Sequence, residues 1–192
     1  MQTLLLSTGV VTLAEIGDKT QLLAFILATR FKKPIPIILG ILVATIINHA
    51  LAGALGAWIT TALSPQTLRW ILGISFIAMA VWTLIPDKLD ESEASVGRRL
   101  GVFGATLVTF FLAEMGDKTQ LATVALAAKS AFPIEVVIGT TLGMMIADVP
   151  AVILGKQLGH RVPMKLVHTI AACIFLALGI ATLCGVGSEW GI

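Results

Sequence analysis

Two copies of one acidic motif carry the side chains of this chain that are best suited to chemistry. Each copy reads Glu-x-Gly-Asp-Lys-Thr-Gln, at residues 15–21 and again at residues 114–120. Each copy therefore offers two carboxylates and a carboxamide within seven positions. Their oxygens are hard ligands that suit Mn²⁺, Ca²⁺ or Mg²⁺ better than metals that favour thiolate. The pair of motifs predicts a binding site for a divalent cation.

On a regular helix, both acids of a motif, its lysine and its glutamine share one face, because they lie three to four positions apart around the turn. The motif threonine points elsewhere unless the helix is irregular at the glycine. If the two copies fold together, four carboxylates and two carboxamides surround one cavity. The metal-site residues predicted from this pattern are Glu15, Asp18, Gln21, Glu114, Asp117 and Gln120.

The composition places these charges in a membrane protein. The chain is 57% hydrophobic and 12% charged, with a mean hydropathy of +0.96, which is more apolar than a soluble domain tolerates. Apolar stretches long enough for spans of about 20 residues predict an all-α polytopic fold in a lipid bilayer. No exposed basic domain remains for binding nucleic acid. The six predicted transmembrane helices cover residues 4–29, 35–62, 67–86, 100–128, 134–156 and 164–186.

Basic residues predict the orientation of these spans, because cytoplasmic loops are enriched in lysine and arginine. Nine of the thirteen basic residues fall in the loops on one side, which we expect to be cytoplasmic: Arg30, Lys32, Lys33, Lys88, Arg98, Arg99, Lys156, Arg161 and Lys165. Both termini are then extracytoplasmic. No basic residue precedes Lys19, so the first span is a retained helix rather than a secretory signal.

The chain repeats itself at an offset of 99 residues, from Glu15 to Glu114. Residues 13–22 match residues 112–121 as one block, and Pro34 and Gly40 match Pro133 and Gly139 further along. We therefore divide the chain into a first three-helix repeat at 1–86, a cytoplasmic linker at 87–99 and a second repeat at 100–192.

Because three is an odd number of spans, the second repeat must enter the membrane from the opposite side. Inverted repeats of this kind are common in secondary transporters, whose binding sites lie near the midplane. We expect the first and fourth helices to cross there. Gly17 and Gly116 would allow close backbone approach or a local break in these two helices.

The charge of the motifs predicts that the protein exchanges a divalent cation for protons or Na⁺. Four carboxylates and two lysines leave a formal charge of −2, which one divalent cation neutralises. Each isolated charge at the bilayer centre costs at least about 2.5 kcal/mol, so protons or Na⁺ should replace a departing metal. An alternative is that the acids pair with Lys19 and Lys118 across the two halves. For these lysines, ion pairing and a gating or proton-relay role both stay open.

Three further polar residues lie in the second and fifth predicted spans. Asn48 and His49 lie in the first half, and Asp148 occupies the position that matches His49 in the second half. An acid inside an apolar span, here close to Pro150, is a candidate proton relay or a partner of the metal ligands. His49 is either wetted near the outer surface or able to shuttle protons. A site with histidine on one side and aspartate on the other could favour Mn²⁺ over Ca²⁺.

The duplicated motif resembles that of a family of small membrane proteins with two Glu-x-Gly-Asp-(Lys/Arg)-(Thr/Ser) copies, which is grouped with calcium/cation antiporter-like transporters. The resemblance covers essentially the whole chain, and both copies are complete. It adds Thr20 and Thr119 to the expected cation-site residues. Eukaryotic relatives are linked to Mn²⁺ and Ca²⁺, and bacterial members of this size look like manganese exporters. It therefore implies export of Mn²⁺ across a bacterial inner membrane.

Other functions stay open at this point. A Ca²⁺/H⁺ antiporter would use the same oxygen ligands. A small amino-acid exporter could have a similar size, although four carboxylates would repel the carboxylate of its substrate. An intramembrane aspartyl protease resembles Gly-x-Gly-Asp, but glutamate stands at the first position here, and we expect a transporter without a cofactor rather than an enzyme. The sequence decides neither the counter-ion nor whether the chain forms a homo-oligomer.

Overall fold

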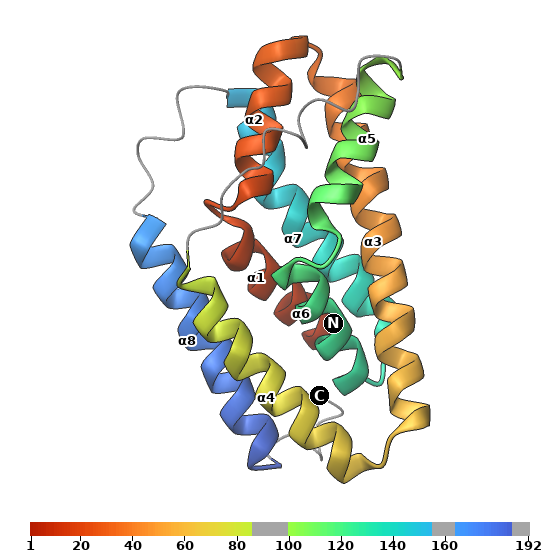
Figure 1. Cartoon of the computed structure of the whole chain (residues 1–192), viewed down its shortest axis with the longest axis vertical. Coiled ribbons are helices and arrows are strands. Elements are labelled where there is room, and N and C mark those ends of the chain that lie inside the picture. The colour runs from red at the N-terminus through yellow and green to blue at the C-terminus, as the bar shows by residue number, and fades with distance from the viewer. Residues whose placement is uncertain (86–99, 155–163, 186–192) are drawn as a thin grey trace.

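The computed structural model describes residues 1–85, 100–154 and 164–185, and every regular element within these ranges is an α-helix. The all-α prediction is therefore confirmed. Two of the helices, α3 and α7, are long and apolar enough to cross a membrane. The helices are α1 (Gln2–Glu15), α2 (Lys19–Phe31), α3 (Pro34–Ala62), α4 (Pro65–Thr83), α5 (Gly101–Glu114), α6 (Lys118–Lys129), α7 (Pro133–Leu154) and α8 (Met164–Leu183), as shown in Figure 1.

The first and fourth predicted helices are not continuous, which corrects the expectation of single spans at 4–29 and 100–128. Each is interrupted inside its acidic motif, so that α1 gives way to α2 and α5 gives way to α6. Gly17 and Gly116 have φ values of 86° and 79°, in the left-handed region that glycine adopts without a steric penalty. Asp18 then starts α2 by accepting a hydrogen bond from the Lys19 N–H. The alternative of a local break at the glycines is confirmed.

Matched helices of the two halves run in opposite directions. In Figure 1, α3 descends from the end where α2 finishes, whereas α7 climbs back toward that end. The halves also exchange packing partners, because α1 lies along α7 of the other half and α5 lies along α3. They share one interior, and the motifs meet inside it.

The division into two repeats stays a prediction, and the linker at 87–99 lies outside the described residues, as do most of the basic loop residues used for orientation.

Small residues bring the broken helices close to the long ones. A Cβ added to Gly143 of α7 would lie 2.7 Å from the backbone oxygen of Thr8 on α1. A Cβ added to Gly40 of α3 would lie 2.7 Å from Cβ of Thr106 on α5. Such contacts leave no room for a larger side chain, so the two long helices hold the interrupted helices at backbone distance.

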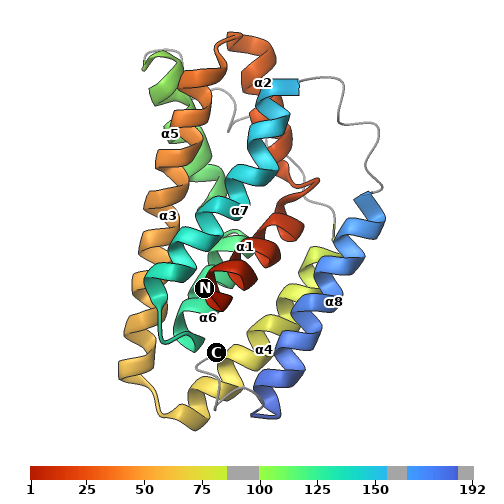
Figure 2. The ribbon, with the colours of Figure 1, turned by 180° about the vertical axis from the view of Figure 1, so that it is seen from behind.

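Helices α4 and α8 pack against each other along one flank of the molecule, as Figure 2 shows from behind. Phe76 and Phe175 stack between them with ring centroids 6.5 Å apart. The same apolar cluster continues through Val10 of α1 and Leu126 of α6. Helices α4 and α8 thus support the outer side of α1 and α6, on the flank away from α2 and α5.

Candidate metal centre

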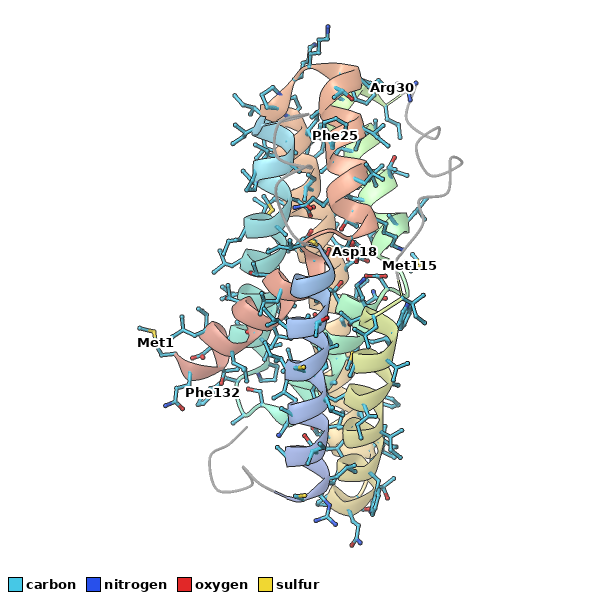
Figure 3. The ribbon with its side chains drawn as sticks, turned by 90° about the vertical axis from the view of Figure 1, so that its left-hand side faces the viewer. Met1, Asp18, Phe25, Arg30, Met115 and Phe132 are labelled. Carbon is cyan, nitrogen blue, oxygen red and sulfur yellow. The ribbon has the colours of Figure 1, made fainter. Side chains whose placement is uncertain are left out.

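The two helix breaks meet at mid-height in the molecule. Figure 3 shows Asp18 and Met115, one from each break, level with each other and between Arg30, at one end, and Phe132, on the opposite side of the breaks. A break leaves backbone N–H groups without their partners in the helix, and side chains can bind them instead. The motif glutamines do this. Oε1 of Gln21 accepts from the Gly17 N–H at 3.0 Å, and Oε1 of Gln120 accepts from the Gly116 N–H at 2.7 Å.

Three acidic side chains converge where the breaks meet. Glu15, Glu114 and Asp117 each contribute one carboxylate oxygen to a group whose members all lie within 4.8 Å of one another. The three residues are 0%, 0% and 3% exposed. Like charges this close in a buried site repel each other strongly unless a cation lies between them. Of the residues that the structure describes, these are the ones whose acidic groups could jointly hold a metal ion.

The motif threonines point into this group because the helices are broken at the glycines. The Thr20 hydroxyl donates to Glu15 Oε2 at 2.7 Å, and the Thr119 hydroxyl donates to Glu114 Oε2 at 3.1 Å. The other oxygen of each glutamate, Oε1, is buried and has no hydrogen-bond partner among the described residues. Each threonine therefore orients one glutamate and leaves its second oxygen available to a ligand.

The motif lysines form ion pairs that cross between the two halves. Lys118 Nζ lies 2.9 Å from Asp18 Oδ2, and Lys19 Nζ lies 3.6 Å from Asp117 Oδ1. The first pair is almost fully buried, whereas the Lys19 side chain is 17% exposed. The ion pairs predicted as an alternative thus occur at the aspartates. They compensate part of the acidic charge and tie the two breaks together.

Asp148 on α7 is a further buried acid, although it is not one of the three whose oxygens lie within 4.8 Å of one another. Its charge interacts with Asp18, Glu15 and Glu114, and neither of its carboxylate oxygens has a hydrogen-bond partner in the described part of the chain. His49, its counterpart on α3, is also fully buried, so the expectation that it could be wetted near a surface is wrong.

Backbone carbonyls complete the surroundings of the site, and sequence reasoning missed them. Nδ2 of Asn48 donates to the Phe111 carbonyl at 3.1 Å, and Nε2 of Gln21 donates to the Ala147 carbonyl at 3.0 Å. Both bonds connect one half of the chain to the other. No side-chain pattern signals a carbonyl acceptor, so only the packing of the helices could reveal these links.

The sequence of this chain matches a family of known proteins. The sequence profile described as "Divalent cation/proton antiporter GDT1" matches twice, over residues 3–91 and 102–190. The chain belongs to the GDT1 family. Each match contains one acidic motif and one helix break. The long apolar helices α3 and α7 agree with a membrane transporter of the GDT1 family.

Relatives within the GDT1 family come from bacteria and plants. A Vibrio cholerae protein with the provisional name of manganese exporter is 50% identical over 183 residues, which cover 95% of this chain and 90% of the relative. GDT1-like protein 3 of Oryza sativa is 28% identical, over 92% of this chain and 71% of the relative. A GDT1-like protein of Synechocystis is 29% identical, over 90% and 92%. No solved structure matches this chain.

Proposed function

We propose that this protein is a secondary transporter that exports Mn²⁺ from the cytoplasm in exchange for protons. One observation carries the proposal: three buried acidic side chains place carboxylate oxygens within 4.8 Å of one another where two helix breaks meet. Membership in a family of divalent cation/proton antiporters supports the exchange. The transported ion is the substrate of this site.

The chemistry of the ligands supports a hard divalent cation. We propose that Mn²⁺ binds to oxygens of these carboxylates, together with those of the threonine hydroxyls and glutamine carboxamides of the two motifs. Oxygen ligands suit Mn²⁺ and Ca²⁺ alike, so a Ca²⁺/H⁺ antiporter is the second candidate. The name of the Vibrio cholerae relative favours Mn²⁺. The proposed ligands are Glu15, Asp18, Thr20, Gln21, Glu114, Asp117, Thr119 and Gln120, surrounded by Lys19, Lys118, Asn48, His49 and Asp148.

Charge balance supports the exchange. Lys118 and Lys19 compensate Asp18 and Asp117, whereas Glu15 and Glu114 have no lysine within ion-pair distance among the described residues. A divalent cation supplies the missing positive charge. When it leaves a site with so little access to water, other cations must take its place, because buried unpaired carboxylates are costly. We propose protons as these counter-ions, with Na⁺ as the alternative that the experiment separates.

We further propose that the chain spans a bacterial inner membrane six times, as two inverted three-helix repeats with extracytoplasmic termini. The opposite directions of α3 and α7 support the inversion (Figure 1). Arg30, which this orientation assigns to the cytoplasmic side, lies at one end of the molecule (Figure 3). The two broken helices would then meet near the bilayer midplane, where secondary transporters bind their substrates.

The test is radiometal flux in proteoliposomes. We expect the wild type to move ⁵⁴Mn²⁺ faster than ⁴⁵Ca²⁺, with a rate that changes when the pH gradient is reversed and not when Na⁺ is replaced by choline. The variants Glu15→Gln, Asp18→Asn, Glu114→Gln and Asp117→Asn should insert but fail to transport. Glu135→Gln is the matched control, because Glu135 is an acid of α7 that pairs with the N-terminal ammonium and not with a residue of either motif.

The outcomes separate the candidates. Faster movement of Ca²⁺ would favour the second candidate, and indifference to both gradients would refute exchange. Normal transport by two or more of the four motif variants would refute the site. Export of amino acids without movement of metal would support a carrier of organic zwitterions instead.

A further inference from the structure

The site is built from equivalent residues of two halves, yet it is not symmetric. The group of close carboxylates contains Glu15, Glu114 and Asp117 but not Asp18, the counterpart of Asp117. Asp18 is instead held by Lys118 at 2.9 Å, and its other oxygen starts helix α2. The equivalent pair, Lys19 with Asp117, is longer at 3.6 Å and is more exposed. One aspartate thus faces the glutamates, while the other is held closely by a lysine.

A second arrangement follows from the repeat. The glutamates, aspartates and lysines of the two motifs have identical counterparts 99 residues away, so these residues can exchange roles without a new contact type. In the exchanged arrangement Lys19 would hold Asp117 closely, and Asp18 would join the two glutamates. Transporters built from inverted repeats alternate between states in which the repeats exchange roles around a fixed central site.

We propose that Lys19 and Lys118 act as alternating latches. Each lysine in turn holds the aspartate of the other half in a close ion pair, and the aspartate that is not held binds the cation. In the state seen here Lys118 withdraws Asp18, and the cation binds Glu15, Glu114 and Asp117. In the other state Lys19 withdraws Asp117, and Asp18 takes its place. The choice of ligands rests on the proposed function, whereas the alternation of the latches does not. Both lysines are positioning residues, since they act through the aspartates.

The physical reason is that one aspartate cannot serve an ammonium group and a metal ion equally well in a buried site. Exchanging partners keeps each buried charge compensated in both states, whereas simple release would leave a carboxylate unpaired. The halves are unlike at one matched position, where His49 stands opposite Asp148. The two arrangements therefore differ in energy.

The first test needs no metal. Met115 is 54% exposed, whereas its counterpart Ile16 is partly buried, and the exchange of roles should reverse this. In a background with Cys173→Ser and Cys184→Ser, the variants Ile16→Cys and Met115→Cys are made separately, and their cysteines are alkylated with a maleimide. We expect Lys19→Gln to raise the ratio of the rate at position 115 to that at position 16, and Lys118→Gln to lower it, each by about tenfold.

The controls keep this outcome interpretable. Lys19→Arg and Lys118→Arg retain the charge and should keep the wild-type ratio. Should Lys118→Gln fail to fold, Lys19→Gln decides alone, because that side chain is partly exposed. The proposal is overturned if the two glutamine variants move the ratio in the same direction, or if Lys19→Gln leaves it unchanged.

The second test measures equilibrium binding of ⁵⁴Mn²⁺ to purified protein. In the Lys19→Gln background, Asp117→Asn should weaken binding by at least about tenfold while Asp18→Asn has little effect. In the Lys118→Gln background the order should reverse. If the same aspartate dominates in both backgrounds, the ligand exchange is refuted. If the wild type binds no Mn²⁺, the proposed function fails. The alkylation ratio then still tests whether Lys19 and Lys118 alternate as latches.

Discussion

Replacing Lys118 by methionine should destabilise the protein more than the same replacement of Lys19. Both variants keep an apolar stem of similar length, so they differ mainly in the charge that they leave behind. Lys118→Met leaves the fully buried Asp18 carboxylate without its ammonium partner at 2.9 Å. Removing one partner of a buried ion pair costs about 3–5 kcal/mol, because the remaining charge stays in the interior.

The equivalent loss at Lys19 should be about half as large. Coulomb energy scales inversely with distance, so the change from 2.9 Å to 3.6 Å weakens attraction by only about a fifth. The larger part of the difference comes from burial. The Lys19 side chain is 17% exposed, so water can approach the vacated position and solvate Asp117, whereas Lys118 at 2% exposure leaves no such route.

Thermal unfolding of the detergent-solubilised variants measures this difference. For a chain of this length, about 3 kcal/mol corresponds to a fall in Tm of roughly 6–12 °C. The double variant Lys118→Met with Asp18→Asn should recover most of the loss, since no unpaired charge remains. Equal falls in Tm for the two lysine variants, or no recovery in the double variant, would show that burial of the pair does not determine its contribution.

Three further outcomes follow from the geometry. Gly116→Ala should lower the free energy of unfolding by about 1 kcal/mol, because φ is 79° at this residue. Gly9→Ala should not lower it, and an added Cβ has open space at both positions. Thermal melting compares the two variants. Gly143→Ala should separate α1 from α7 and reduce flux several-fold with normal insertion, because its Cβ would lie 2.7 Å from a backbone oxygen. Thr20→Val should weaken Mn²⁺ binding by about tenfold, since Glu15 loses an orienting bond, and Thr20→Ser should restore it.

Much of the fold follows from patterns that are local in the sequence. Long apolar stretches identify helices whatever their neighbours are, so the positions of α3, α4, α7 and α8 were predicted to within a few residues. The repeat likewise needs no structure, because it is a comparison of the chain with itself. Hydropathy cannot detect the breaks in the first and fourth spans, since a helix interrupted for three residues remains apolar on both sides.

The identity of the acidic residues was readable from the motif, but their division of labour was not. Helical spacing predicted that Glu15 and Asp18 share a face, yet the break lies between them and sends the two side chains to different partners. The sequence could not show which aspartate lies with the two glutamates and which is held closely by a lysine, because both are carboxylates at equivalent positions. That distinction depends on which lysine arrives from the other half, at a separation of about a hundred residues.

The sequence alone therefore determined the membrane class, the duplication and the residue types of the two motifs, since composition and self-similarity are properties of the chain itself. Only the tertiary structure decided that Asp117, rather than Asp18, lies with Glu15 and Glu114. It did so because two backbone breaks and the packing of α1 on α7 and α5 on α3 set the distances between residues from opposite halves.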